Sequence, residues 1–208
     1  MKVASNLRYP LDALFSVRSH IAILRALQNT KEGMSARGVA RAAGVNHQAC
    51  AVALRKLEQL GAVSRMGSGR TQLLRLNRES HLVSDLILPL LRKERQWISI
   101  VHKAVVQAFE QSALTITVFG STARGEDTPG SDLDVLVVAR NIYDKNAVLR
   151  SAALDNSDFM NRFGVRCSPV VLTLAEVKSR IRNKDKLVKN ILKEGLDLLP
   201  IRLRMVAQ

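Results

Sequence analysis

The chain has 208 residues, enough for one large or two small domains, and 47% of them are hydrophobic, so that each half can bury a core. Aromatic residues make up only 4%, which argues against a protein that binds single-stranded nucleic acid by stacking its bases. The formal net charge is +14, and residues 1–78 hold 13 Lys/Arg against 3 Asp/Glu. This first third is therefore the predicted contact surface for a polyanion, most simply nucleic acid, with plain solubility as the alternative reading.

The cysteine content and the apolar stretches bear on localisation. Cys50 and Cys167 match no metal-ligand spacing and are predicted to be free thiols in a reducing compartment. The most apolar stretch, residues 82–91, is interrupted by Asp85 and Pro89 and is too short to span a bilayer. We therefore expect a cytoplasmic protein without membrane contact.

The first third of the chain is predicted to form helices followed by a hairpin. Apolar positions recur at helical spacing from residue 11 to residue 27 and predict one helix. Residues 35–43 and 47–60 predict two more helices, with Ser35 and Asn46 as N-caps. Two short strands, at 62–66 and 71–76, are expected on either side of a Gly-rich turn.

This order of elements resembles the winged helix-turn-helix family, mainly over Ala40–Val63 with its Ala42-Ala43-Gly44-Val45 turn. The resemblance covers about residues 11–78, defines a predicted domain at 1–80, and implies binding to double-stranded DNA. In such domains the second helix of the motif enters the major groove. The predicted DNA-binding residues are Arg37, Arg41, Asn46, His47, Gln48, Arg55, Arg65 and Arg70. Taken singly, Gln48 and Arg55 can equally be ordinary solvated helix residues.

Residues 81–112 predict a helical connector with a start or a kink near Pro89. Its apolar positions recur at helical spacing, so it is more typical of a packing helix than of a free linker. A homodimer contact on this segment is a further hypothesis.

The remaining residues, 113–208, predict a compact layer of strands and helices. Strands are expected at 114–119, 133–138 and 165–172, and helices at 144–163, 175–183 and 186–194. With the helical first third, this pattern places the whole chain in the α+β class.

The turn after the first of these strands carries the candidate chemistry. Gly120 has no Cβ, so that phosphate can approach the backbone there, and Ser121 adds a hydroxyl donor. Arg124 can form charge-assisted hydrogen bonds with phosphate. Asp132 and Asp134 are two residues apart on a strand and so project from one face, with Cα atoms about 6.5–7 Å apart. Such a pair can hold Mg²⁺ (or Mn²⁺), which prefers oxygen ligands.

Gly120-Ser121 followed by Asp132-Leu133-Asp134 resembles the DNA polymerase β-type nucleotidyltransferase superfamily, in particular its small bacterial members. The resemblance implies a nucleotidyltransferase fold with a small mixed sheet and flanking helices. It implies that Gly120 and Ser121 hold a nucleoside triphosphate (NTP), that Asp132 and Asp134 are catalytic and bind the divalent metal, and that pyrophosphate leaves.

The superfamily also carries a third carboxylate on a following strand. The matching strand here, residues 165–172, contains no acid, and Arg166 would bring positive charge if it faced the site. Glu176, just past the strand, is the candidate substitute. Without a third carboxylate the domain is expected to bind nucleotide and metal with doubtful turnover.

Three functions remain open at this point, and the sequence favours the first over the second. The first is a DNA-binding transcriptional regulator whose nucleotidyltransferase-fold domain binds NTP and metal. The second is an active nucleotidyltransferase that modifies a protein, RNA or small-molecule acceptor. The third, implied by the resemblance, is one member of a toxin–antitoxin-like pair with a neighbour-encoded partner. A basic cluster near the C-terminus is interpreted as a solvated helix face or an extension of the nucleic-acid contact; its members are Lys178, Arg180, Arg182, Lys184, Lys186, Lys189 and Lys193.

Overall fold

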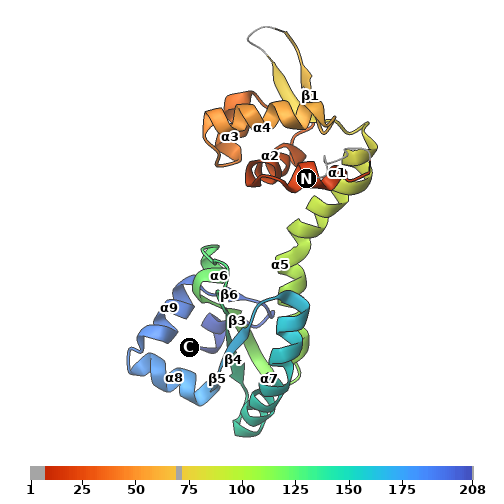
Figure 1. Cartoon of the computed structure of the whole chain (residues 1–208). Coiled ribbons are helices and arrows are strands. Elements are labelled where there is room, and N and C mark those ends of the chain that lie inside the picture. The colour runs from red at the N-terminus through yellow and green to blue at the C-terminus, as the bar shows by residue number, and fades with distance from the viewer. Residues whose placement is uncertain (1–7, 69–71, 208) are drawn as a thin grey trace. The chain divides into compact units, whose positions relative to one another are not determined.

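The computed structural model describes residues 8–68 and 72–207, and the chain divides into two compact units, Met1–Gln96 and Trp97–Gln208 (Figure 1). The division falls inside one helix, α5 (Leu88–Phe109). The first part of α5 contributes Leu88 and Leu91 to the core of the first unit, whereas its second part contributes to the core of the second unit.

The first unit consists of helices, a hairpin and a π-helical turn. Its elements are α1 (Pro10–Phe15), α2 (Arg18–Gln28), α3 (Ala36–Ala42), α4 (His47–Gln59), β1 (Val63–Met66), β2 (Leu73–Leu76) and η2 (Leu82–Ile87). The two predicted N-caps are confirmed: Ser35 Oγ accepts a hydrogen bond from the Gly38 amide at 3.1 Å, and Asn46 Oδ1 accepts one from the Ala49 amide at 2.8 Å. These caps fix the starts of α3 and α4 because they satisfy amides that have no partner within the helix.

The predicted single helix over residues 11–27 is wrong. The chain forms α1 and α2 instead, because Val17 adopts an extended conformation (φ −139°, ψ 137°) between them. Val17 follows the helical spacing in the sequence, yet its side chain is 49% exposed. The core of the unit lies between α2, α4 and the hairpin and contains Leu27, Leu57 and Leu74.

The second unit is built on a four-stranded mixed sheet with the order β5–β4–β3–β6. The strands are β3 (Ala113–Val118), β4 (Leu133–Ala139), β5 (Cys167–Thr173) and β6 (Leu196–Asp197). β4 runs antiparallel to β3 and parallel to β5, while β6 pairs antiparallel with β3. The helices are α6 (Gly120–Arg124), α7 (Ile142–Phe163), α8 (Leu174–Arg182), α9 (Lys186–Glu194) and α10 (Leu203–Val206).

Helices cover both faces of this sheet (Figure 1). On one face, Val135 and Val137 of β4 pack with buried residues of α5 and α7. On the other face, Leu136 and Val138 pack with buried residues of α8, α9 and α10. Side chains alternate along a strand, so Asp134 belongs to the face that α8–α10 cover. The α+β class and the mixed sheet with flanking helices are therefore confirmed for this unit.

Pro89 is the second residue of α5, directly after the π-helical turn η2, so the predicted start or kink near Pro89 coincides with a change of helix type. None of the helices in residues 8–68 and 72–207 has the length and apolar character needed to cross a membrane.

Candidate functional site

The candidate site lies where β3 ends and β4 begins. The Phe119 amide donates to the Asp134 carbonyl at 3.0 Å, which brings the turn after β3 against the start of β4. Gly120 has φ 73°, a left-handed conformation that favours glycine, and a Cβ at this position would overlap the Asp134 carboxylate. The structure therefore brings together the glycine turn and one of the two predicted acids by direct contact.

Ser121 follows in the first turn of α6, a five-residue helix that ends at Gly125 in the left-handed conformation. No side chain caps the start of α6 at Phe119. The Ser121 hydroxyl makes no hydrogen bond within the described residues, so it is free to donate to a ligand. The turn thus offers a hydroxyl next to a backbone without a Cβ.

Asp134 lies in β4 and Asp132 directly precedes that strand, close enough for its charge to act on Asp134. Asp132 is exposed and Asp134 is half-buried. Burial, and second the negative charge of Asp132, raise the pKa of Asp134. A divalent cation between the two carboxylates would relieve both effects, so the pair fits a metal such as Mg²⁺, with phosphate and water oxygens completing the ligand set.

Arg124, predicted to bind the nucleotide, is already engaged. Its Nε donates to Glu126 at 2.7 Å, and its Nη1 lies 3.5 Å from Glu194 of α9. The hydrogen bond that Arg124 donates to Glu126, with the charges of both acids, raises the pKa of Arg124. A triphosphate would have to compete with these two exposed carboxylates for the guanidinium. The approach of Glu194 was not predicted, because it joins residues that are 70 positions apart.

The proposed substitution of Glu176 for the third carboxylate is wrong. Glu176 accepts hydrogen bonds from Lys145 Nζ at 2.7 and 2.8 Å and from the Thr173 amide at 2.7 Å, where it completes the capping box of α8. Lys145, and then the Thr173 amide, lower the pKa of Glu176. Because β5 runs parallel to β4, Glu176 follows the opposite end of the strand: Thr173, whose amide donates to Glu176, is about 17 Å along β5 from Ser168, the register partner of Asp134.

On β5, the residue that lies beside Asp134 is Ser168, which is not an acid. Ser168 is the register partner of Asp134, and paired residues of parallel strands point to the same face. Arg166 is two residues earlier, next to Asp132 in register, and is exposed. Among the side chains that the structure describes, in residues 8–68, 72–152 and 157–207, no three His, Cys, Asp or Glu form a group that could hold a metal.

Comparison with known proteins agrees with this geometry. Residues 98–198 match the family described as "Nucleotidyltransferase domain". This segment is a nucleotidyltransferase domain of the DNA polymerase β superfamily. The nucleotidyltransferase domain is also similar to the "Putative protein adenylyltransferase MJ1305" of Methanocaldococcus jannaschii, with 37% identity over 70 residues. Those residues make up 32% of this chain and 46% of the relative, so the chain spans less than half the length of that protein.

A second set of predicted residues belongs to the first unit. On α4, Gln48 and Arg55 are exposed and share one helix face with Val52, which is 59% exposed. His47 precedes them and is also exposed, as are Arg37 and Arg41 on α3.

Of the three other predicted DNA contacts, two have partners within the protein and one is not described by the structure. The Oδ1 of Asn46 is used to cap α4. Arg65 on β1 donates to both carboxylate oxygens of Glu58, at 2.8 and 3.0 Å, and to Gln72 at 2.7 Å. Arg70 lies outside the described residues. The predicted DNA contacts that are exposed and have no partner among the described residues therefore lie on α3 and α4.

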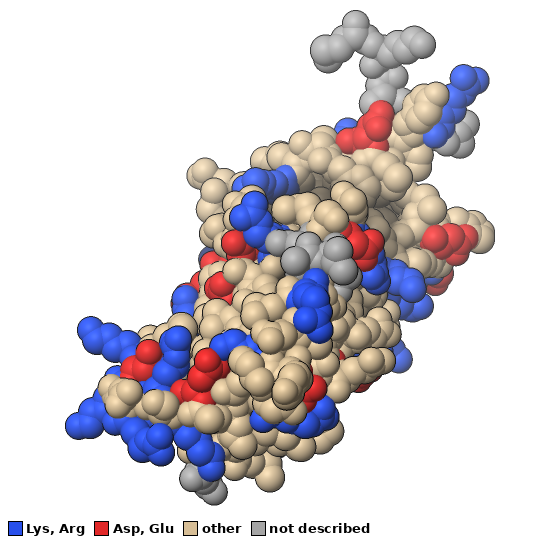
Figure 2. All heavy atoms as spheres, turned by 90° about the horizontal axis from the view of Figure 1, so that it is seen from below, with Lys and Arg blue, Asp and Glu red and all other residues tan. Residues whose placement is uncertain are grey.

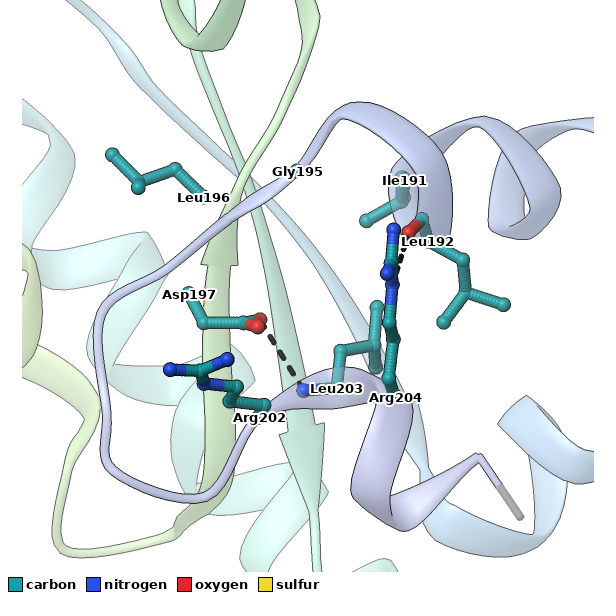
Figure 3. A pocket seen from close by; sticks show the side chains of 8 residues that line it. All are labelled: Ile191, Leu192, Gly195, Leu196, Asp197, Arg202, Leu203 and Arg204. Carbon is teal, nitrogen blue, oxygen red and sulfur yellow. Dashed lines mark hydrogen bonds between the residues drawn. The ribbon is translucent and has the colours of Figure 1, made fainter.

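Sequence reasoning also missed a pocket beside the nucleotidyltransferase sheet, of about 330 Å³ (Figure 3). It is lined by Ile191, Leu192, Gly195, Leu196, Asp197, Arg202, Leu203 and Arg204. Asp197 accepts hydrogen bonds from Thr117 Oγ1 at 2.7 Å and from the Leu203 amide at 3.3 Å, so this acid ties β6 to β3 and to α10. The two-residue strand β6 gave no recognisable pattern in the sequence.

Proposed function

We propose that the protein is a nucleotidyltransferase that moves a nucleoside monophosphate from an NTP to a hydroxyl group of an acceptor. The observation that supports this most directly is the contact of the Asp134 carboxylate with Gly120, which joins the phosphate-binding turn to an acid pair. A turn without a Cβ, a free hydroxyl and two neighbouring carboxylates at the start of β4 form a site suited to a metal-bound triphosphate.

In the proposed reaction, the backbone at Gly120 and the hydroxyl of Ser121 hold the triphosphate, and Asp132 and Asp134 hold the metal. When bound, the metal would neutralise charge on the phosphate oxygens. The acceptor oxygen forms a bond to the α-phosphorus, the bond from that phosphorus to the bridging oxygen breaks, and pyrophosphate leaves. Because Ser168 replaces an acid, the hydroxyl proton passes to solvent, and we expect slow turnover.

Adenosine triphosphate is the first substrate to test, since the relative from Methanocaldococcus jannaschii is named a protein adenylyltransferase. The purified chain is incubated with each α-labelled NTP, Mg²⁺ or Mn²⁺ and cell extract, and labelled macromolecules are separated. Asp132→Asn should lose the label. Asp127→Asn is the matched control, because it makes the same change at an exposed acid of the same loop. Absence of label with the wild type would overturn the proposal.

A second function, DNA binding by the first unit, is supported by one further observation. Gln48, Val52 and Arg55 form an exposed stripe on α4, in a winged helix-turn-helix order of elements with 13 Lys/Arg in residues 1–78. We propose that this stripe contacts double-stranded DNA and that the protein acts as a transcriptional regulator.

The measurement for this second function is affinity for DNA from upstream of the protein's own gene, taken over a range of salt concentrations. Phosphate contacts should make affinity fall steeply as salt rises. Binding that does not change with salt, or no binding, would contradict this function and leave the transferase proposal intact.

A further inference from the structure

A basic surface covers α8 and α9 in the nucleotidyltransferase domain. We define the basic α8–α9 surface by its exposed members, which are Arg182, Lys184, Lys186, Lys189 and Lys193. On α9 the three lysines recur at spacings of three and four residues and therefore lie on one face. Figure 2 shows Lys and Arg side chains gathered over these helices, at the lower left of the view.

Acids in the same segment do not offset this charge. Asp185 caps α9 through the Val188 amide at 3.0 Å and lies 3.5 Å from Arg180. Glu194 is shared between Arg124 at 3.5 Å and Lys193 at 3.8 Å.

Within the described parts of the chain, the other four members of the surface, Arg182, Lys184, Lys186 and Lys189, form no ion pair. A surface that serves only solubility usually mixes both signs.

In the turn between α8 and α9, a lysine adopts a left-handed backbone conformation that favours glycine. Lys184 has φ 54° and is the only non-glycine residue with positive φ in residues 8–68 and 72–207. Its amide donates to the Ile181 carbonyl at 3.0 Å, and the Asp185 amide donates to the Arg180 carbonyl at 2.9 Å. These two bonds form a Schellman motif, whose left-handed position is usually glycine. A lysine there is strained, and a function for its charge is one reason to retain it.

The surface begins at the candidate site. α9 ends at Glu194, whose carboxylate meets Arg124 of α6, and α8 and α9 cover the sheet face that carries Asp134. α9 has nine residues and is therefore about 13 Å long, so Lys186 lies within about that distance of the end of α9 beside the site. A polyanion held along α9 would have one end close to the triphosphate-binding turn.

We infer that the basic α8–α9 surface binds the phosphate backbone of a helical RNA and presents it as the acceptor of the nucleotidyl group. The chain has no Phe, Tyr or Trp after Phe163, so α8 and α9 carry no aromatic residue on which single-stranded bases could stack, which favours the backbone of a double helix. An acceptor needs a free hydroxyl, which RNA carries on every ribose and intact duplex DNA carries only at its ends. The acceptor role rests on the proposed function, whereas the binding does not require turnover.

The test measures binding of the full chain to a 20-base-pair RNA hairpin by fluorescence anisotropy over a salt series. The variant Lys186→Gln/Lys189→Gln is compared with Lys103→Gln/Arg150→Gln. This control pair removes two exposed cations from α5 and α7, which pack on the opposite face of the sheet. Affinity falls as salt rises, so the slope of log affinity against log salt is negative. In the α9 pair we expect this slope to become less steep by about 0.9 for each lost phosphate contact.

Three results would overturn the inference. The first is an equal loss of RNA affinity in both pairs. The second is an equal loss, in the α9 pair, for a DNA duplex of the same sequence, which would make the surface a general DNA contact. The third is unchanged RNA binding in the α9 pair together with an acidic protein as the labelled acceptor. That result would support the proposed transfer and contradict RNA binding by the basic α8–α9 surface.

Lys184→Gly separates function from folding. Glycine relieves the strained conformation, so the melting temperature should not fall, while RNA affinity should drop severalfold with the loss of one contact. Unchanged affinity in Lys184→Gly would contradict the role given to this residue.

Labelling of the same RNA by the wild type and Asp132→Asn then tests the acceptor role. Asp132→Asn should bind the RNA and leave it unlabelled. RNA that binds through α9 but is never labelled by the wild type would overturn the acceptor role and leave the binding surface standing.

Discussion

The two regions of interest, the turn at Gly120 and the exposed stripe on α4, differ in how they are built. At Gly120 a backbone with φ 73° is packed against the Asp134 carboxylate, so two segments of the chain restrict each other. On α4, Gln48, Val52 and Arg55 point away from the protein, and nothing in the fold restricts them. The first region therefore carries information about its ligand in its own geometry. The second can be understood only through what it binds.

The largest effect should come from removing an acid at the Gly120 turn. Asp134→Asn is expected to lower nucleotidyl transfer about 100-fold or more, because metal-held charge stabilisation is worth several kcal/mol. The same change should slightly raise stability without metal, since burial and Asp132 raise the pKa of Asp134 and so disfavour its charged form in the folded state.

That gain in stability should fade as the pH falls through the folded pKa of Asp134, where the wild-type carboxyl is also neutral. Thermal melting at several pH values, together with the transfer assay, checks both parts. Nucleotidyl transfer by an Asp134→Asn variant would contradict the claim that the geometry of the Gly120 turn, unlike the α4 stripe, reflects its ligand.

The next effect tests whether the turn itself is required. Gly120→Ala places a Cβ against the Asp134 carboxylate and forces alanine into a left-handed conformation, so we expect loss of transfer and a destabilisation of about 2 kcal/mol. Gly125→Ala is the matched control, because its φ of 68° is similar and no atom lies within 4 Å of the added Cβ. Denaturant unfolding and activity are compared in both variants; equal losses would show that backbone strain alone explains the effect.

A smaller effect is expected on α4. Arg55→Gln should weaken binding to duplex DNA about tenfold and reduce its salt dependence, because one phosphate or base contact is lost. The control, Lys31→Gln, removes an exposed lysine outside the stripe and should bind the DNA as the wild type does. Nucleotidyl transfer should be unchanged in both variants. Equal weakening by the two substitutions would mean that net charge, and not the α4 stripe, determines the affinity.

The smallest effect concerns Glu176. Glu176→Gln should leave transfer intact and cost about 1 kcal/mol of stability, because the capping box of α8 and the ion pair with Lys145 are weakened. The lowered pKa of Glu176 means that its contribution is present above its unfolded pKa and is lost as the pH falls through its folded pKa. Denaturant unfolding at neutral and acid pH measures this difference; a large loss of transfer would restore Glu176 as a catalytic acid.

Local features of the fold were predictable from the sequence, and contacts between distant segments were not. The caps at Ser35 and Asn46 and the start of α5 near Pro89 follow from side-chain chemistry within a few residues. The break at Val17 was missed, because apolar spacing continues through a residue that the fold leaves half-exposed.

The site shows the same limit. Gly120, Ser121, Asp132 and Asp134 could be identified by spacing, and the register of β4 with β3 puts the turn against the acids. That Ser168 faces Asp134, and that Arg124 meets Glu194, depends on the pairing of β5 with β4 and on the packing of α9. No pattern within a single segment specifies those pairings.

The central claim is tested most directly by incubating the full chain with α-labelled ATP, Mg²⁺ and cell extract, beside Asp132→Asn and its control Asp127→Asn. The account predicts a labelled acceptor with the wild type and with Asp127→Asn, and none with Asp132→Asn. Equal labelling by all three proteins, or no labelling by the wild type with any NTP, would contradict it.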